Sequence, residues 1–183
     1  MKKLSVIALI ATIVLSACGQ KDPGLKDAYK NYFKIGVAVT PRNVTDSLQA
    51  SIILKEFNSI TAENCMKPGE IHPRPGVWNF TQADAIANFC RANGIKLRGH
   101  CLMWHSQIGK WMYEDNPTKE VFFKRMRNHI HTIVNRYKDV IYCWDVVNEA
   151  ITDDRNSSDP YRQSPLYKIA GDEFIAKAFE YAR

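Results

Sequence analysis

The sequence lacks the short motifs that mark several large classes of enzyme. No glycine-rich phosphate loop follows the first predicted strand, which argues against a dinucleotide-binding fold. No Gly-x-Ser-x-Gly elbow is present, so a nucleophilic serine of that type is not expected. Cys-x-x-Cys and His-Glu-x-x-His spacings are absent as well. The remaining candidate ligands are isolated: Cys65, His72, His100, Cys101 and His105. The sequence therefore predicts neither a metal site nor a cofactor.

The chain also has little excess charge of either sign and no apolar run long enough to span a bilayer comfortably. Its 25 basic and 19 acidic side chains give a formal net charge of +6, and the two kinds are interspersed. This pattern does not predict a surface that binds nucleic acid. The apolar run at residues 4–15 has about the length of a signal-peptide core. Neither an internal repeat nor a low-complexity segment is visible.

The first residues have the layout of an export signal. A basic start precedes the apolar run, which ends in Leu-Ser-Ala-Cys-Gly at residues 15–19. This ending resembles a bacterial lipobox, in which the chain is cut before the cysteine and the thiol is lipidated. We interpret residues 1–17 as a lipoprotein signal peptide, Cys18 as the lipidated residue and residues 18–30 as a tether, and we expect the protein to be membrane-anchored in the bacterial cell envelope, in the outer membrane or at the cell surface. The alternative is a plain secretory signal with a chance cysteine.

Four further cysteines remain after Cys18: Cys65, Cys90, Cys101 and Cys143. Export would permit disulfides. Cys90 and Cys143, however, lie inside apolar elements, where a free cysteine acts as a small hydrophobic residue. The even count alone does not establish a disulfide framework.

From residue 34 onward the apolar periodicity alternates between two types. Strands are predicted at residues 34–39, 57–61, 96–99 and 140–147, and helices at residues 46–57, 81–93, 117–137 and 172–183. Residues 63–80, rich in proline and glycine, are predicted to form a long loop. The order βαβαβαβα predicts an α/β fold with a parallel sheet and helices packed outside it.

Polar side chains cluster at and just past the ends of the second, third and fourth strands. They are Glu63, Asn64, Lys67, His100, Trp104, Gln107, Asn148 and Glu149. Because the carboxyl ends of parallel strands meet at one edge of a sheet, we expect these side chains to share a rim. A tryptophan plate, hydrogen-bonding groups and a glutamic acid that can protonate a glycosidic oxygen are typical of a carbohydrate site.

Each of these residues also has a purely structural interpretation. Glu63 and Lys67 fit a surface ion pair, which contributes only about 0.3–0.5 kcal/mol. His100 fits a core histidine bonded to a backbone carbonyl, and Trp104 and Trp111 fit ordinary packing. Asp145 lies inside the fourth predicted strand and favours a structural role, since it would need partners there. The shared placement on one rim favours a site for the group as a whole.

Three stretches closely resemble glycoside hydrolase family ten, whose members are mostly endo-1,4-β-xylanases on a TIM (β/α)8 barrel. They are FNSITAENCMKPGEIHPRPGVWNF at residues 57–80, GHCLMWHSQ at residues 99–107 and WDVVNEA at residues 144–150. They occur in the family's order at plausible spacing. The resemblance implies that residues 31–183 form about the first four βα units of such a barrel. It also implies a retaining hydrolase that cleaves internal β-1,4 bonds of xylan, with xylan or xylo-oligosaccharide as its partner.

The resemblance further implies a role for each rim residue. Glu149 matches the general acid/base, and Asn148 matches the residue that bonds the 2-hydroxyl of the sugar. The other matches bind sugar: Glu63, Asn64 and Lys67 on the non-reducing side of the cleavage point, and His100, Trp104 and Gln107 around the sugar being cleaved. Trp144 and Asp145 match positions that support the end of the fourth strand.

The family's second carboxylate has no match in this sequence. A retaining mechanism needs a nucleophile, which in the family is a glutamate at the end of the seventh strand. We therefore expect an N-terminal fragment or a truncated product that is inactive by itself. Two alternatives stay open: a related barrel β-glucanase, and a surface lipoprotein that binds glycans without cleaving them.

Overall fold

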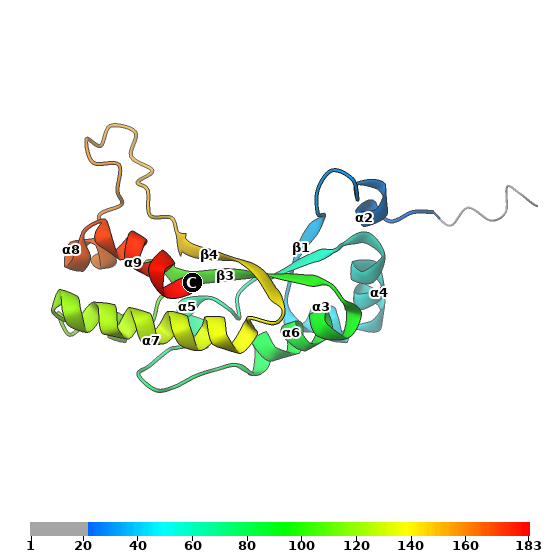
Figure 1. Ribbon diagram of the computed structural model, residues 1–183, viewed down its shortest axis with the longest axis horizontal. Helices are drawn as coiled ribbons and strands as arrows, with labels where there is room; N and C mark the ends of the chain where they lie inside the picture. The colour runs from blue at the N-terminus through cyan, green and yellow to red at the C-terminus, as the bar shows by residue number, and fades with distance from the viewer. Residues whose placement is uncertain (1–21) are drawn as a thin grey trace, which may run out of the picture.

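The computed structural model describes residues 22–183 (Figure 1). The expected signal peptide and Cys18 lie outside these residues. The strands are β1 (Gly36–Val39), β2 (Ser59–Ala62), β3 (Lys96–Trp104) and β4 (Ile141–Asn148). The helices are α2 (Leu25–Ala28), α3 (Pro41–Thr45), α4 (Ser47–Glu56), α5 (Pro68–Ile71), α6 (Thr81–Asn93), α7 (Lys119–Tyr137), α8 (Pro165–Ala170) and α9 (Glu173–Ala182), with the short 3-10 helix η1 (Lys110–Met112). In this part of the chain no helix combines the length and the apolar character needed to cross a membrane.

The four strands form one parallel sheet in the order β1-β2-β3-β4. A single row of residues runs across it, since Val37 pairs with Ile60, Ile60 with Leu97 and Leu97 with Ile141. The two central members of this row, Ile60 and Leu97, are completely buried. The predicted parallel α/β arrangement is therefore confirmed.

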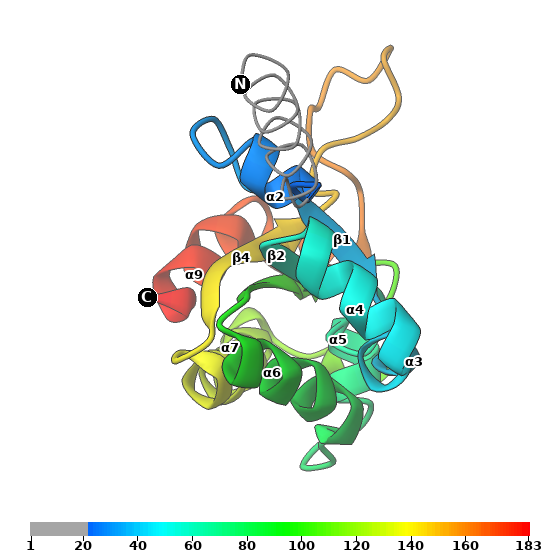
Figure 2. The ribbon, with the colours of Figure 1, turned by 90° about the vertical axis from the view of Figure 1, so that its right-hand side faces the viewer.

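The long helices cover the outside of the sheet. Figure 2 shows them in an arc that runs from α4 through α6 and α7 to α9. Helix α7 turns a continuous buried stripe inward that is apolar except for one histidine; it is formed by Phe122, Met126, His129, Ile130, Ile133 and Tyr137. These positions recur every three or four residues, which is the spacing of one helix face. In α6, Cys90 is fully buried and unpaired, as expected of a cysteine that packs as a small hydrophobic residue.

The third strand is longer than its sequence predicted. It continues past Gly99 to Trp104, because after a shift in register it keeps pairing with β4, where Met103 lies opposite Val147. His100 and Trp104, expected at or just past the end of this strand, thus lie within it. Helix α7 begins two residues later than predicted, since the Thr118 hydroxyl caps it by accepting a hydrogen bond from the next turn. Helices α2, α3, α5 and α8 were not predicted.

The segment expected as a tether is docked from Gly24 onward. The Leu25 backbone N–H donates to the Glu56 carboxylate over 2.8 Å, which fixes α2 against the end of α4. A Cβ at Gly24 would lie 2.0 Å from the Lys55 carbonyl oxygen, so only glycine permits this approach. The last residues of the expected tether thus contact α4.

A buried histidine pair joins the long loop to α7. His72 Nδ1 and His129 Nδ1 lie 3.1 Å apart, and His129 Nε2 lies 3.0 Å from the Leu102 carbonyl oxygen. His129 Nε2 must donate to this carbonyl, so its Nδ1 accepts and His72 Nδ1 donates. Burial lowers the pKa of His72 to about 4. Burial, followed by the neighbouring ring, lowers the pKa of His129 to about 3, so both rings are neutral at pH 7.

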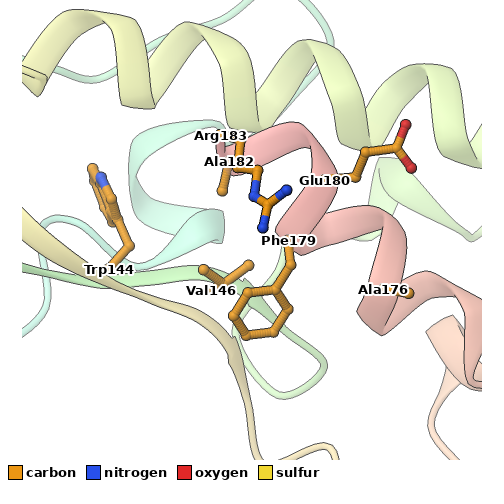
Figure 3. A pocket seen from close by; sticks show the side chains of 7 residues that line it. All are labelled: Trp144, Val146, Ala176, Phe179, Glu180, Ala182 and Arg183. Carbon is orange, nitrogen blue, oxygen red and sulfur yellow. The ribbon is translucent and has the colours of Figure 1, made fainter.

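The outer edge of β4 borders an open groove (Figure 3). Its volume is about 460 Å³, and it is lined by Trp144, Val146, Ala176, Phe179, Glu180, Ala182 and Arg183. Phe179 is 54% exposed there although it is a large apolar side chain. Strand β1 forms the other edge of the sheet. Both edges carry backbone groups that no strand of the described chain pairs.

We expect a polypeptide of residues 22–183, produced by itself, to associate into dimers or larger species. Unpaired strand edges and the apolar groove favour pairing with a second chain. Light scattering across a concentration series should show the association. Phe179→Lys should weaken it without unfolding the protein, because Phe179 lies on the groove and not in the core. A monomer at every concentration would contradict the expectation.

The histidine pair should make the fold sensitive to acid. The pKa values in the folded state lie below the ordinary histidine value of about 6.5, so unfolding takes up protons at low pH. The stabilisation is fully present above pH 6.5 and is lost as the pH falls toward 4, by about 1.4 kcal/mol per unit of pKa difference. Chemical unfolding measured from pH 7 to pH 4 should show this loss. His72→Phe should flatten the pH dependence of the free energy of unfolding, whereas His131→Gln, on the same helix as His129, should not. Equal slopes in the unchanged protein and both variants would show that the histidine pair does not cause the acid sensitivity.

Candidate active site

The carboxyl ends of β2, β3 and β4 meet at one rim, as the sequence predicted. Glu63 follows β2 directly, and its backbone N–H donates to the Val39 carbonyl at the end of β1 over 3.0 Å. At the ends of β3 and β4, Trp104 lies opposite Asn148 in register. The register therefore places Glu149, the next residue, beside the indole of Trp104.

Glu149 projects its carboxylate from the end of β4. Trp104 Nε1 donates to Glu149 Oε2 over 2.8 Å, which fixes one carboxylate oxygen. The side chain is otherwise exposed. The backbone of Glu149 is left-handed, with φ of 52°, a conformation that residues other than glycine rarely adopt. An exposed carboxylate held by one indole N–H is free to exchange a proton with a bound ligand.

Lys67 and Asn64 extend the rim on the other side of Trp104. Lys67 Nζ donates to Asn64 Oδ1 over 2.8 Å and lies 5.2 Å from the centroid of the Trp104 ring, within range of a cation–π contact. Asn64, Lys67, Trp104 and Glu149 thus form a continuous row. Among the ion pairs of residues 22–183 none joins Glu63 to Lys67, so the alternative of a surface ion pair is wrong.

His100 is hydrogen-bonded to a carboxylate on the neighbouring strand. Its Nδ1 lies 2.9 Å from Asp145 Oδ2, and its ring centroid lies 6.2 Å from that of Trp104. Asp145 also forms an ion pair with Arg98. Burial opposes ionisation of Asp145, but hydrogen bonds from Arg98 and His100 outweigh it and lower the pKa of this carboxyl. Asp145 therefore has the partners that its structural interpretation required, whereas His100 is bonded to a carboxylate and not to a backbone carbonyl.

Gln107 and Trp111 occupy different surroundings. The Gln107 carbonyl accepts a hydrogen bond from the Gly69 N–H over 2.7 Å, which ties the loop after β3 to α5. Its side chain is exposed. Trp111 donates from Nε1 to the His72 carbonyl oxygen over 3.0 Å and packs against the histidine ring. Trp111 therefore serves packing, as its interpretation favoured.

The cysteines do not form a metal or redox centre in the described part of the chain. Cys65, Cys90, Cys101 and Cys143 are all unpaired. Burial raises the pKa of Cys101 to about 12 and that of Cys65 to about 11, which keeps both thiols protonated at neutral pH. No group of three potential ligands is arranged around a point within residues 22–183.

One residue at the rim, Arg162, was not predicted from the sequence. Its Nε donates to the Glu149 carbonyl oxygen over 2.9 Å, although it lies in the polar loop after β4. The loop has no apolar periodicity that would indicate where it returns. His105 lies nearby, where burial and then the Arg162 charge lower its pKa.

Residues 24–183 match the model of glycosyl hydrolase family 10. The chain belongs to this family. It is 56% identical, over its whole length and 28% of the relative, to an endo-1,4-beta-xylanase/feruloyl esterase of Xylanibacter ruminicola. It is 46% identical, over 87% of its length and 25% of the relative, to endo-1,4-beta-xylanase A of a Caldicellulosiruptor species.

Solved structures of family 10 superpose on the chain closely. A psychrophilic family 10 endo-beta-1,4-xylanase gives a TM-score of 0.84 at 62% identity, covering 87% of this chain and 51% of that one. A xylanase of Paenibacillus barcinonensis gives 0.83 at 42% identity, with coverages of 90% and 50%. The chain thus spans about half the length of these structures. Its four βα units form half of the family 10 (β/α)8 barrel, which confirms the fold that the resemblance implied.

Proposed function

We propose that this chain supplies the acid/base half of a retaining endo-β-1,4-xylanase active site. The observation that carries the proposal is the Glu149 carboxylate at the end of β4, exposed and bonded by Trp104 Nε1 over 2.8 Å. In (β/α)8 barrels the catalytic groups lie at the carboxyl ends of the strands. The family 10 relatives described above bear the name xylanase, which favours xylan over a β-glucan.

In the proposed reaction Glu149 first acts as an acid. It donates its proton to the glycosidic oxygen while a second carboxylate attacks the anomeric carbon and forms a covalent glycosyl-enzyme. Glu149, now ionised, then removes a proton from water, which releases the sugar and restores both carboxyl groups. The resemblance implies that the second carboxylate follows the seventh strand, outside residues 1–183. Residues 19–183 by themselves are therefore expected to be inactive.

The remaining rim residues are proposed to hold the xylan chain. Asn64 and Lys67 are already joined by a hydrogen bond, so their free donors and acceptors are fixed relative to Trp104. This preorganisation suits hydroxyl groups of a sugar bound beside the Trp104 ring. Glu63, His100, Gln107 and Asn148 complete the set that is expected to contact the sugars.

The location of the protein is proposed from the sequence of its first residues. Removal of residues 1–17 and lipidation of Cys18 would anchor the enzyme in the bacterial cell envelope. An anchor of this kind needs more than one acyl chain, because each buried CH₂ contributes only about 0.8 kcal/mol.

Glu149→Gln tests the acid. The amide keeps the shape but carries no transferable proton, so kcat/KM on xylan should fall by at least about 10²-fold. An activated phenolate leaves without protonation, so the kcat/KM of the variant on a xyloside with this leaving group should fall by less. Both are measured in a protein that continues through the second half of the barrel. Asp139→Asn, at the opposite end of the sheet, is the control and should leave kcat/KM on both substrates unchanged.

Full activity of Glu149→Gln on both substrates would exclude Glu149 as the acid. Hydrolysis of a mixed-linkage glucan in preference to xylan would instead support the β-glucanase alternative. Xylo-oligosaccharide binding without turnover, in the protein isolated from its natural host, would support the glycan-binding alternative.

Cys18→Ser tests the anchor. In a bacterial host the unchanged protein should take up labelled fatty acid and partition with membranes, whereas Cys18→Ser should be released or remain unprocessed. The thioether-forming sulfur is the only atom of the side chain that is replaced. A Cys18→Ser protein that still carries the label would rule the anchor out.

A further inference from the structure

The backbone of Glu149 is held in a conformation that its own chemistry disfavours. A φ of 52° places it in the left-handed region, where a Cβ crowds the neighbouring carbonyl. Among residues 22–183 only Asn116 shares this feature outside glycine. Such a conformation persists only where the surroundings fix it, and it is concentrated at functional positions. The contacts that fix Glu149 therefore bear on where its carboxylate points.

Arg162 supplies the contact to the Glu149 backbone. Its Nε donates to the Glu149 carbonyl oxygen over 2.9 Å, and its Nη2 donates to Asp153 Oδ2 over 2.7 Å. The guanidinium is planar, so two bonds from its two sides fix its orientation. The Arg162 side chain is 24% exposed, whereas that of Asp153 is 89% exposed.

The loop after β4 is built to return Arg162 to this position. Arg162 N–H donates to the Ala150 carbonyl over 2.8 Å, and Ile151 pairs with Tyr161 in an antiparallel bridge. The Thr152 N–H also donates to the Pro160 carbonyl over 2.9 Å. The two ends of the loop thus lie side by side, directly beyond Glu149.

We propose that Arg162 is a positioning residue for the proton transfer by Glu149; this rests on the proposed function. It acts on the backbone of Glu149 and does not touch the substrate. Trp104 fixes one carboxylate oxygen, and Arg162 fixes the carbonyl at the other end of the same residue. If the peptide relaxed to negative φ, the Cα–Cβ bond would swing away from Trp104. The carboxyl group would then no longer meet the glycosidic oxygen.

Arg162→Met is the principal test, in a protein that continues through the second half of the barrel. Methionine keeps an unbranched side chain that reaches about as far as Arg Nε, and it removes both donors. The matched control is Arg125→Met, because Arg125 also binds a backbone carbonyl, that of Trp111 over 2.9 Å, and a carboxylate, that of Asp115 over 2.5 Å. Its side chain is 23% exposed, like that of Arg162.

A misplaced acid should have a selective effect. A displacement of about 1 Å can cost about 10²-fold in rate, so kcat/KM of Arg162→Met on xylan should fall by about that factor. The kcat/KM on a xyloside with an activated phenolate should be unchanged, because that leaving group needs no proton. Arg162→Lys keeps the positive charge and one donor nitrogen, and should recover part of the activity on xylan. Arg125→Met should leave both values unchanged.

Other outcomes separate this inference from the proposed function. Equal losses on both substrates, or no loss on xylan, would overturn the positioning role of Arg162. If Glu149→Gln also retained full activity on xylan, the proposed function would fail as well. Should Arg162→Met not fold, Asp153→Asn loosens the same guanidinium from an exposed position. It should produce the same selective loss to a smaller degree, and unchanged activity on xylan would then refute the proposal.

Discussion

The pairing of β3 with β4 is the constraint on which the rim depends. Leu97 lies opposite Ile141, and after the irregularity between His100 and Met103 the indole of Trp104 lies opposite Asn148. A slip of one residue would turn every side chain of the strand to the other face. The hydrogen bond from Trp104 to the next residue, Glu149, exists only in the observed register. Strand pairing and the position of the carboxylate are therefore one structural fact.

Both faces of the strand pair hold this register. On one face Gly99 lies opposite Trp144, and a Cβ there would lie 2.1 Å from the indole ring, so the glycine makes room for the tryptophan. On the other face His100 lies opposite Asp145 and bonds to it over 2.9 Å. Neighbouring residues in a strand point to opposite faces, so the two pairs act independently. The hydrogen bond of Asp145 to His100 thereby also helps to hold the register on which the rim depends.

The sequence predicts the parts of the fold that depend on local pattern. Apolar runs indicate the four strands, and the polar residues at and after their ends indicate the rim. The spacing of Glu63 and Lys67 was misleading, because it implies a helical turn that residues 63–67 do not form. Arg162 was not predictable, since its contact with Glu149 depends on how a loop without periodicity folds back. Long-range contacts of loops follow from tertiary geometry, which leaves no trace in local spacing.

The division of the barrel has a consequence for the chemistry. Trp104 and Arg162 both donate hydrogen bonds to Glu149, and both lie within this half of the barrel. The direction of the Glu149 carboxylate is therefore fixed by contacts inside this chain. The distance from this carboxylate to a nucleophile is not fixed by these contacts. A retaining pair stands about 5–5.5 Å apart, and in the proposed enzyme that spacing arises only when the second half closes against the edges of β1 and β4. In the proposed enzyme, closure of the barrel would therefore set the distance between the two carboxyl groups, while contacts inside this chain already hold the Glu149 carboxylate.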